Sequence, residues 1–105
     1  MKGHEAASKL TEMVEACRIL EEAGIDILSI LMSDARCYIQ CSSITMPIYI
    51  KNHTEIPYNI KRITGDDYDY CWLWTAVSGI ECGCAIGEHT AQEISKERTK
   101  NDETV

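Results

Sequence analysis

The 105-residue chain contains no phenylalanine, only two prolines and no apolar run approaching 20 residues. A helix that spans a bilayer needs roughly 20 apolar residues, so the sequence excludes a membrane-spanning helix. Positive charge is also scarce, because ten Lys and Arg stand against seventeen Asp and Glu, for a net charge of -7. Such a chain is repelled by a phosphate backbone, which argues against direct nucleic-acid binding.

Motifs for catalysis are missing as well. The sequence has no glycine-rich phosphate loop, no dinucleotide fingerprint and no zinc-protease motif. None of the three histidines lies in a signature around a nucleophilic cysteine. The acidic run Gly65–Tyr70 lacks the ligand spacing of a calcium loop. We therefore expect a protein that is not an enzyme and needs no cofactor.

Six cysteines are the most conspicuous reactive groups. Residues 1–5 lead into a charged helical pattern and not into the apolar stretch of a signal peptide, so we expect a cytoplasmic protein whose free thiols fill the core. The alternative is a zinc-stabilised module with four ligands, namely Cys71, Cys82, Cys84 and His89. Only one residue separates Cys82 from Cys84, which is shorter than the usual ligand spacing, so we favour no metal site.

The length predicts one domain of the α+β class. An amphipathic helix is expected over residues 4–23, closed by Gly24. It should pack on an antiparallel sheet of four or five strands, including residues 25–31 and 37–42. The expected apolar stripe of the helix is Ala6, Leu10, Met13, Val14, Cys17 and Leu20.

Further short strands are expected at Ile48–Ile50 and Ile60–Ile63. The domain should cover residues 1–90, followed by a polar segment at 91–105 that is a weak helix or disordered, with disorder expected over 101–105.

The segment 68–87 predicts a hairpin with a two-residue turn at Ser78-Gly79. Val77 then lies opposite Ile80, and the same register pairs Thr75 with Cys82, Leu73 with Cys84 and Cys71 with Ile86. These residues form one small, apolar face. On the other face Trp74 meets Gly83 and Trp72 meets Ala85, so each large ring covers a small residue.

Aromatic and acidic side chains come together on this hairpin. Net charge is -2 over residues 1–24, +1 over 25–64 and -6 over 65–105. Tyrosine and tryptophan are enriched at binding hot spots, so we expect this surface to bind a protein with a basic surface. The expected partner-binding residues are Asp66, Asp67, Tyr68, Asp69, Tyr70, Trp72 and Trp74. Two alternatives stay open: the N-terminal helix covers the aromatic face, or a second copy does, giving a homo-oligomer.

The layout resembles small accessory proteins encoded by phages and prophages of Gram-positive gut bacteria. Three features carry the resemblance: the helix ending in Ala23-Gly24-Ile25, the cysteine-tyrosine strand to Gln40, and the hairpin Tyr70–Ile86. The resemblance implies a non-enzymatic, anti-defence role, such as anti-CRISPR-like, stoichiometric inhibition of a host nuclease or defence complex. It spans residues 5–87 and identifies no site residue.

Overall fold

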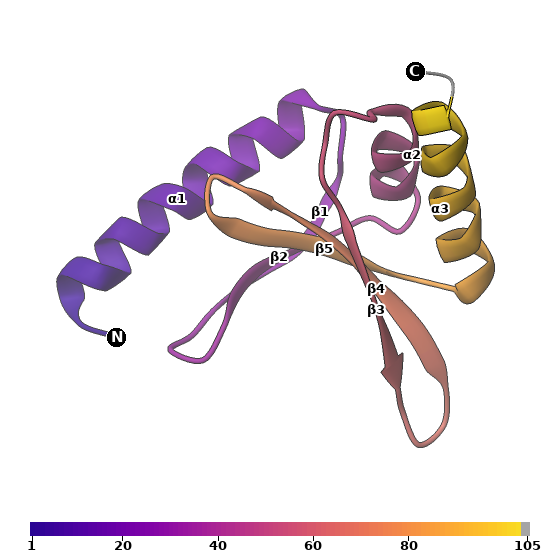
Figure 1. The fold of residues 1–105 in the computed structure, drawn as a ribbon. Helices are drawn as coiled ribbons and strands as arrows, with labels where there is room; N and C mark the ends of the chain where they lie inside the picture. Colours follow the sequence, from indigo (N-terminus) through magenta and orange to yellow (C-terminus); the bar gives the residue numbers. More distant parts are fainter. Residues whose placement is uncertain (104–105) are drawn as a thin grey trace.

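The computed structural model describes residues 1–103, and the side chains of residues 1–99. The fold is α+β, with one five-stranded sheet and three helices (Figure 1). In chain order, the elements are α1 (Gly3–Glu22), β1 (Ile27–Met32), β2 (Cys37–Cys41), α2 (Thr45–Asn52), β3 (Asn59–Thr64), β4 (Asp69–Val77), β5 (Ile80–Ile86) and α3 (Glu88–Glu103).

The strands lie in the order β1-β2-β5-β4-β3. Three neighbouring pairs are antiparallel, whereas β2 and β5 are parallel, with Ile39 opposite Cys82. The expected antiparallel sheet is therefore wrong at this one pair, and the sheet is mixed. Parallel neighbours need a long crossover, which here consists of α2, β3 and β4. β5 returns to the centre of the sheet between β2 and β4.

Residues 48–50 belong to helix α2, so the strand expected at Ile48–Ile50 is wrong. The Ser42 Oγ accepts hydrogen bonds from the backbone N–H groups of Ile44 and Thr45, at 3.1 and 3.3 Å. These bonds satisfy donors that the start of a helix leaves unpaired. Pro47 lies in the first turn, where a missing N–H is tolerated. The β-branched residues of this segment favour a strand, but the Ser42 cap and Pro47, which favour the start of a helix, outweigh them.

Helix α1 forms as expected, but it is rotated about its axis relative to the expected stripe. Met13, Ala16 and Leu20 are buried, whereas Leu10 and Val14 are exposed. The helix ends in a left-handed glycine, Gly24, at φ 78°. The N–H of Ile25 bonds to the carbonyl of Leu20 at 3.0 Å, which completes a Schellman cap.

The β4–β5 hairpin has the expected register from Val77·Ile80 to Cys71·Ile86. Ser78 and Gly79 have φ values of 51° and 79°, the positive values that a tight hairpin turn of this kind requires. The ring of Trp72 leans diagonally onto Gly83. A Cβ on Gly83 would lie 2.6 Å from Trp72 Cζ2 and 2.7 Å from the Leu73 carbonyl oxygen. The close approach of the indole therefore requires glycine at this position.

Replacing Gly83 by alanine should lower the free energy of unfolding by about 2 kcal/mol, because the added methyl group displaces the Trp72 ring. Urea denaturation followed by circular dichroism measures this change. Gly87→Ala is the matched control, since a Cβ there meets nothing within 4 Å. Equal stabilities of the two variants would contradict the packing described for Trp72.

Residues 88–103 form helix α3, which includes most of the segment expected to be a weak helix or disordered. Ala91 and Ile94 are buried in the core. Helical structure extends through residues 101–103, against the expected disorder, and residues 104–105 lie outside the described part of the chain.

Arg98 of α3 is buried and holds the connection between α2 and β3. Its guanidinium donates hydrogen bonds to the carbonyls of Ile50, His53, Thr54 and Ile56 at 2.7–3.2 Å. The guanidinium also lies 4.8 Å from the centre of the Tyr58 ring. One side chain thus satisfies a carbonyl in the last turn of α2 and three carbonyls in the segment that follows it.

Arg98→Ala should destabilise the fold by about 3 kcal/mol, because it leaves buried or half-buried carbonyls without donors. Arg98→Lys should recover only part of this loss, since one ammonium group cannot reproduce the planar fork. Thermal and urea unfolding measure both variants. A stability within 0.5 kcal/mol of wild type for Arg98→Ala, roughly the effect of an ordinary surface change, would contradict the role of the arginine.

Candidate functional site

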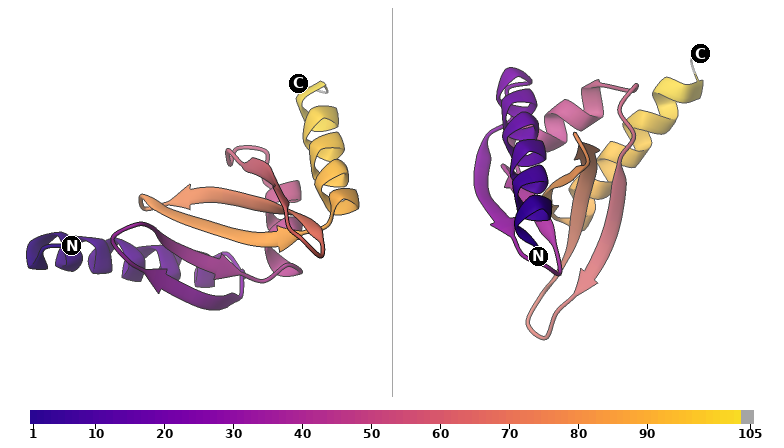
Figure 2. Two further views of the ribbon diagram at one scale, coloured as in Figure 1. Left: turned by 90° about the horizontal axis from the view of Figure 1, so that it is seen from below. Right: turned by 90° about the vertical axis from the view of Figure 1, so that its left-hand side faces the viewer.

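The two faces of the sheet have different environments. On β4, the buried residues Cys71, Leu73 and Thr75 alternate with the half-buried Trp72 and Trp74. Side chains from all three helices share the core or a cavity with the first set. The described residues of the helices thus lie on the cysteine face, and the alternative in which the N-terminal helix covers the aromatic face is wrong. Figure 2 shows the sheet and its helices from two further directions.

The uncovered face carries a groove of about 460 Å³. All of its lining residues come from strands, except Arg36 in the turn before β2. The lining residues are Arg36, Tyr38, Lys61, Ile63, Tyr70, Trp72, Trp74 and Glu81. Aromatic rings and the aliphatic Ile63 supply apolar surface, and three charged side chains lie among them. We call this surface the aromatic groove.

Trp72 is held in place on several sides within the groove. Its Nε1–H donates a hydrogen bond to Glu81 Oε2 at 2.8 Å. The same carboxylate oxygen accepts a hydrogen bond from the Arg36 guanidinium, with which it forms an ion pair. Tyr38 meets Trp72 edge to face, with ring centres 5.8 Å apart. The guanidinium of Arg36 lies 4.3 Å from the centre of the Tyr38 ring. These contacts fix the orientation of the indole.

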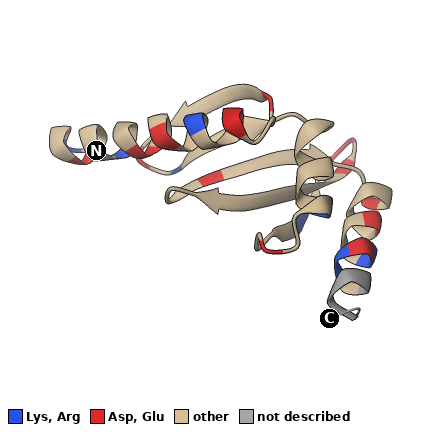
Figure 3. Ribbon diagram, turned by 90° about the horizontal axis from the view of Figure 1, so that it is seen from above, with Lys and Arg blue, Asp and Glu red and all other residues tan. Residues whose placement is uncertain are grey.

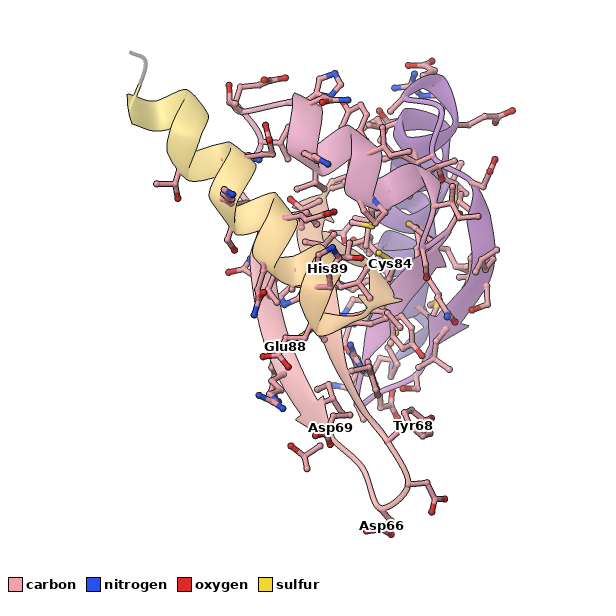
Figure 4. All side chains as sticks on the ribbon, turned by 90° about the vertical axis from the view of Figure 1, so that its right-hand side faces the viewer. Asp66, Tyr68, Asp69, Cys84, Glu88 and His89 are labelled. Atoms are coloured by element: carbon pink, nitrogen blue, oxygen red, sulfur yellow. The ribbon has the colours of Figure 1, made fainter. Side chains whose placement is uncertain are left out.

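The acidic residues lie at one end of the sheet, on the β3–β4 hairpin, where Asp69 shares the face of Cys71 and not that of the groove. Figure 4 shows Asp66 at the protruding tip of the hairpin, with Tyr68 and Asp69 nearer the sheet. Asp66 and Asp67 are exposed, and the rings of Tyr68 and Tyr70 lie 5.9 Å apart. Asp69 instead forms an ion pair with Arg62 at 3.5 Å. Of the seven residues expected to bind a partner, Tyr70, Trp72 and Trp74 line the groove, and Asp66, Asp67, Tyr68 and Asp69 lie on the adjoining hairpin.

The structure does not assemble the alternative zinc site. Cys82 and Cys84 are fully buried, whereas the His89 side chain is 86% exposed on α3 and lies 3.0 Å from Glu93 (Figure 4). Within the part of the chain that the structure describes, no three His, Cys, Asp or Glu residues are arranged to hold a metal ion.

Burial also determines the chemistry of the thiols. Desolvation raises the pKa of Cys41 to about 11, and that of Cys82 and Cys84 to about 12. These groups are therefore protonated near neutral pH, and a protonated thiol is a poor nucleophile. They fill space in the core beneath the helices.

Sequence reasoning missed five lining residues of the groove: Arg36, Tyr38, Lys61, Ile63 and Glu81. Tyr38 and Glu81 are opposite each other in the parallel β2·β5 pair, which the expected antiparallel sheet did not contain. Lys61 lies opposite Trp72 in the β3·β4 pair. The strand expected at Ile60–Ile63 was the only available signal for this position.

Comparison of the chain with family models, curated proteins and solved structures found no match. No helix in the described residues is both long and apolar enough to cross a membrane.

The buried thiols predict a loss of stability at alkaline pH. The thiols ionise near 9.0 when they are free in the unfolded chain, and only near 11–12 in the fold. Between these values the folded chain holds protons that the unfolded chain has lost, so the free energy of unfolding falls as pH rises above 9. Urea titrations at pH 8, 9, 10 and 10.5 measure this slope.

Cys82→Ala provides the comparison for that slope. The substitution leaves a cavity that costs stability at every pH, but it removes one titrating thiol, so the decline above pH 9 should be shallower than in wild type. Parallel curves for the two proteins would show that Cys82 does not ionise differently in the folded and unfolded chains.

Proposed function

We propose that the chain is a non-enzymatic binding protein, and that the aromatic groove takes apolar side chains of a protein partner. The observation that carries this proposal is a concave sheet face, lined by Tyr38, Tyr70, Trp72 and Trp74, which none of the described helices covers. Tryptophan and tyrosine contribute disproportionately to binding energy at protein interfaces. A groove of this size accommodates one or two side chains of a partner.

Rigidity of the groove supports the same proposal. The indole of Trp72 is fixed by Glu81, Tyr38 and Gly83, so little side-chain entropy is lost when a partner packs on it. Hydrogen bonding of the Trp72 Nε1–H within the protein also leaves the exposed part of the ring apolar. Such a surface favours an apolar anchor, with polar contacts around its rim.

Charge around the groove indicates the character of the partner. Asp66 and Asp67 are exposed on the hairpin beside the groove, and acidic residues also lie along α1 and α3, on the other side of the sheet (Figure 3). With a net charge of -7, the chain is attracted to a basic surface. We propose that Asp66 and Asp67 attract the basic surface of the partner, because Asp69 is already paired with Arg62.

If the partner is a nuclease and this chain covers its basic nucleic-acid-binding surface, the partner can no longer bind nucleic acid and its activity is inhibited. We therefore propose that the chain is a stoichiometric inhibitor of a host nuclease or defence complex and acts in an anti-CRISPR-like manner. It is supported by the acidic hairpin beside the groove, which offers carboxylates where such a partner would otherwise bind phosphates. Loss of the partner's nuclease activity at a molar ratio near one, without cleavage of the partner, is the expected result in a titration.

Trp72→Ala combined with Trp74→Ala should weaken partner binding at least 100-fold, because both apolar anchors are removed. The partner is first captured from a bacterial host lysate with wild-type protein and identified by mass spectrometry. Affinity is then measured by calorimetry with the purified partner. Ile48→Ala, on an exposed position of α2 away from the groove, is the control and should bind as wild type.

A second variant tests the charge complement without disturbing the packing of the indole. Asp66→Asn with Asp67→Asn should slow association about tenfold at low salt, and by less at 0.5 M salt, because screening removes the steering. Unchanged affinity of a folded Trp72→Ala, Trp74→Ala variant would refute the groove as the binding site. Unchanged association of the Asn variant would refute only the role of the hairpin.

A further inference from the structure

The two edges of the sheet differ in how they are protected from pairing with another strand. β3, at one edge, carries Lys61 and Arg62, and charged side chains discourage edge-to-edge association. β1, at the other edge, has the sequence Ile-Leu-Ser-Ile-Leu-Met and carries no charge. Leu28, Ile30 and Leu31 are 62%, 54% and 42% exposed, so its aliphatic side chains face solvent on both faces. β1 is thus an edge strand without charged side chains, and its pairing with β2 is regular from Ser29 to Met32, beyond a bulge between Ile27 and Ser29.

Helix α1 adds two aliphatic side chains beside this edge. Leu10 and Val14 are 53% and 70% exposed. At about 100° per residue, they lie roughly opposite Glu12, whose carboxylate approaches Gly79 in the β4–β5 turn. One flank of α1 therefore faces the hairpin, and the flank with Leu10 and Val14 faces the other way, toward the β1 edge. Figure 2 shows β1 as the outer strand beside α1.

We propose that this edge is the interface of a homodimer, in which β1 pairs antiparallel with β1 of a second copy. A two-fold axis near Ile30 would join the two sheets into one of ten strands. Ile30 pairs with the buried Ile39 of β2 and therefore lies on the helix face of the sheet. Because opposite residues of an antiparallel pair share a face, Ile30 would meet Ile30 of the second copy on that face. Leu10 and Val14 would pack on the added strand and would no longer be exposed to water.

Three features indicate a second copy and not an unrelated protein. A partner that fits this surface must offer an open strand edge with apolar side chains on each side of the edge. A second copy offers both features by symmetry. The patch itself is uncharged, so the repulsion between two chains of charge -7 is weakest there. The five side chains and the strand edge amount to roughly 600 Å² per copy, the lower limit for stable interfaces.

Sedimentation equilibrium of the full chain from 5 to 500 µM tests the proposal. Wild type should be dimeric at 100 µM, whereas Ile30→Lys and Val14→Lys should each weaken the dimer at least 100-fold. Val14 is the most exposed of the five, so its replacement should leave the fold intact by circular dichroism even if Ile30→Lys does not. Ile48→Lys, a 57% exposed position on α2, is the matched control and should remain dimeric.

Hydrogen exchange adds a readout specific to the strand. Amides of Ser29–Leu31 should exchange more slowly at 500 µM than at 5 µM, while those of the opposite edge β3 should not change. A wild-type protein that is monomeric at 500 µM would overturn the proposal. The proposal would also be overturned if the Val14→Lys variant and a folded Ile30→Lys variant both still formed the dimer. A dimer lost instead in Trp72→Ala, Trp74→Ala would place self-association on the aromatic groove and would also overturn it.

Discussion

The structure depends on the pairing of β4 with β5, because this register separates two kinds of side chain. It places the thiols of Cys82 and Cys84 on one face, where they are small enough for helices to pack closely above them. It places the rings of Trp72 and Trp74 on the other face, where Gly83 lets an indole lie directly on the backbone. A shift of one strand by one residue would bring the rings of β4 and the thiols of β5 to the same face, so neither face would keep its character. The core and the binding face are thus two consequences of one register.

The same register explains why the aromatic face stays uncovered. α1, α2 and α3 all gain their buried contacts on the cysteine face, and Arg98 ties α3 to the segment that follows α2. Because the helices have a shared core there, none of the described helices is left to cover the rings. The rings are ordered by their neighbours instead, with Glu81 holding both Trp72 and Arg36. A rigid, open, aromatic face beside an acidic hairpin is the basis of the proposed function.

Local patterns predicted the hairpin, its turn and helix α1, because each depends on contacts close in the sequence. The pairing of Trp72 with Ala85 and of Trp74 with Gly83 followed from the turn at Ser78-Gly79 alone. The parallel β2·β5 pair could not be predicted in this way, because it joins residues about 43 positions apart, such as Tyr38 and Glu81. For the same reason Arg36 and Glu81 were missed as part of the groove. Leu10 and Val14 were assigned to the core because periodicity defines an apolar stripe but not which part of it meets the sheet.

The helices pack on the cysteine face and leave the aromatic face open. Nuclear Overhauser effects of the Trp72 and Trp74 ring protons, measured on labelled protein, test this arrangement most directly. We expect contacts of the Trp72 ring with Gly83 Hα and with Tyr38, and contacts of the Leu20 and Ile94 methyl groups with protons of the core. Contacts between either indole and methyl groups of α1, α2 or α3 within one molecule would contradict it.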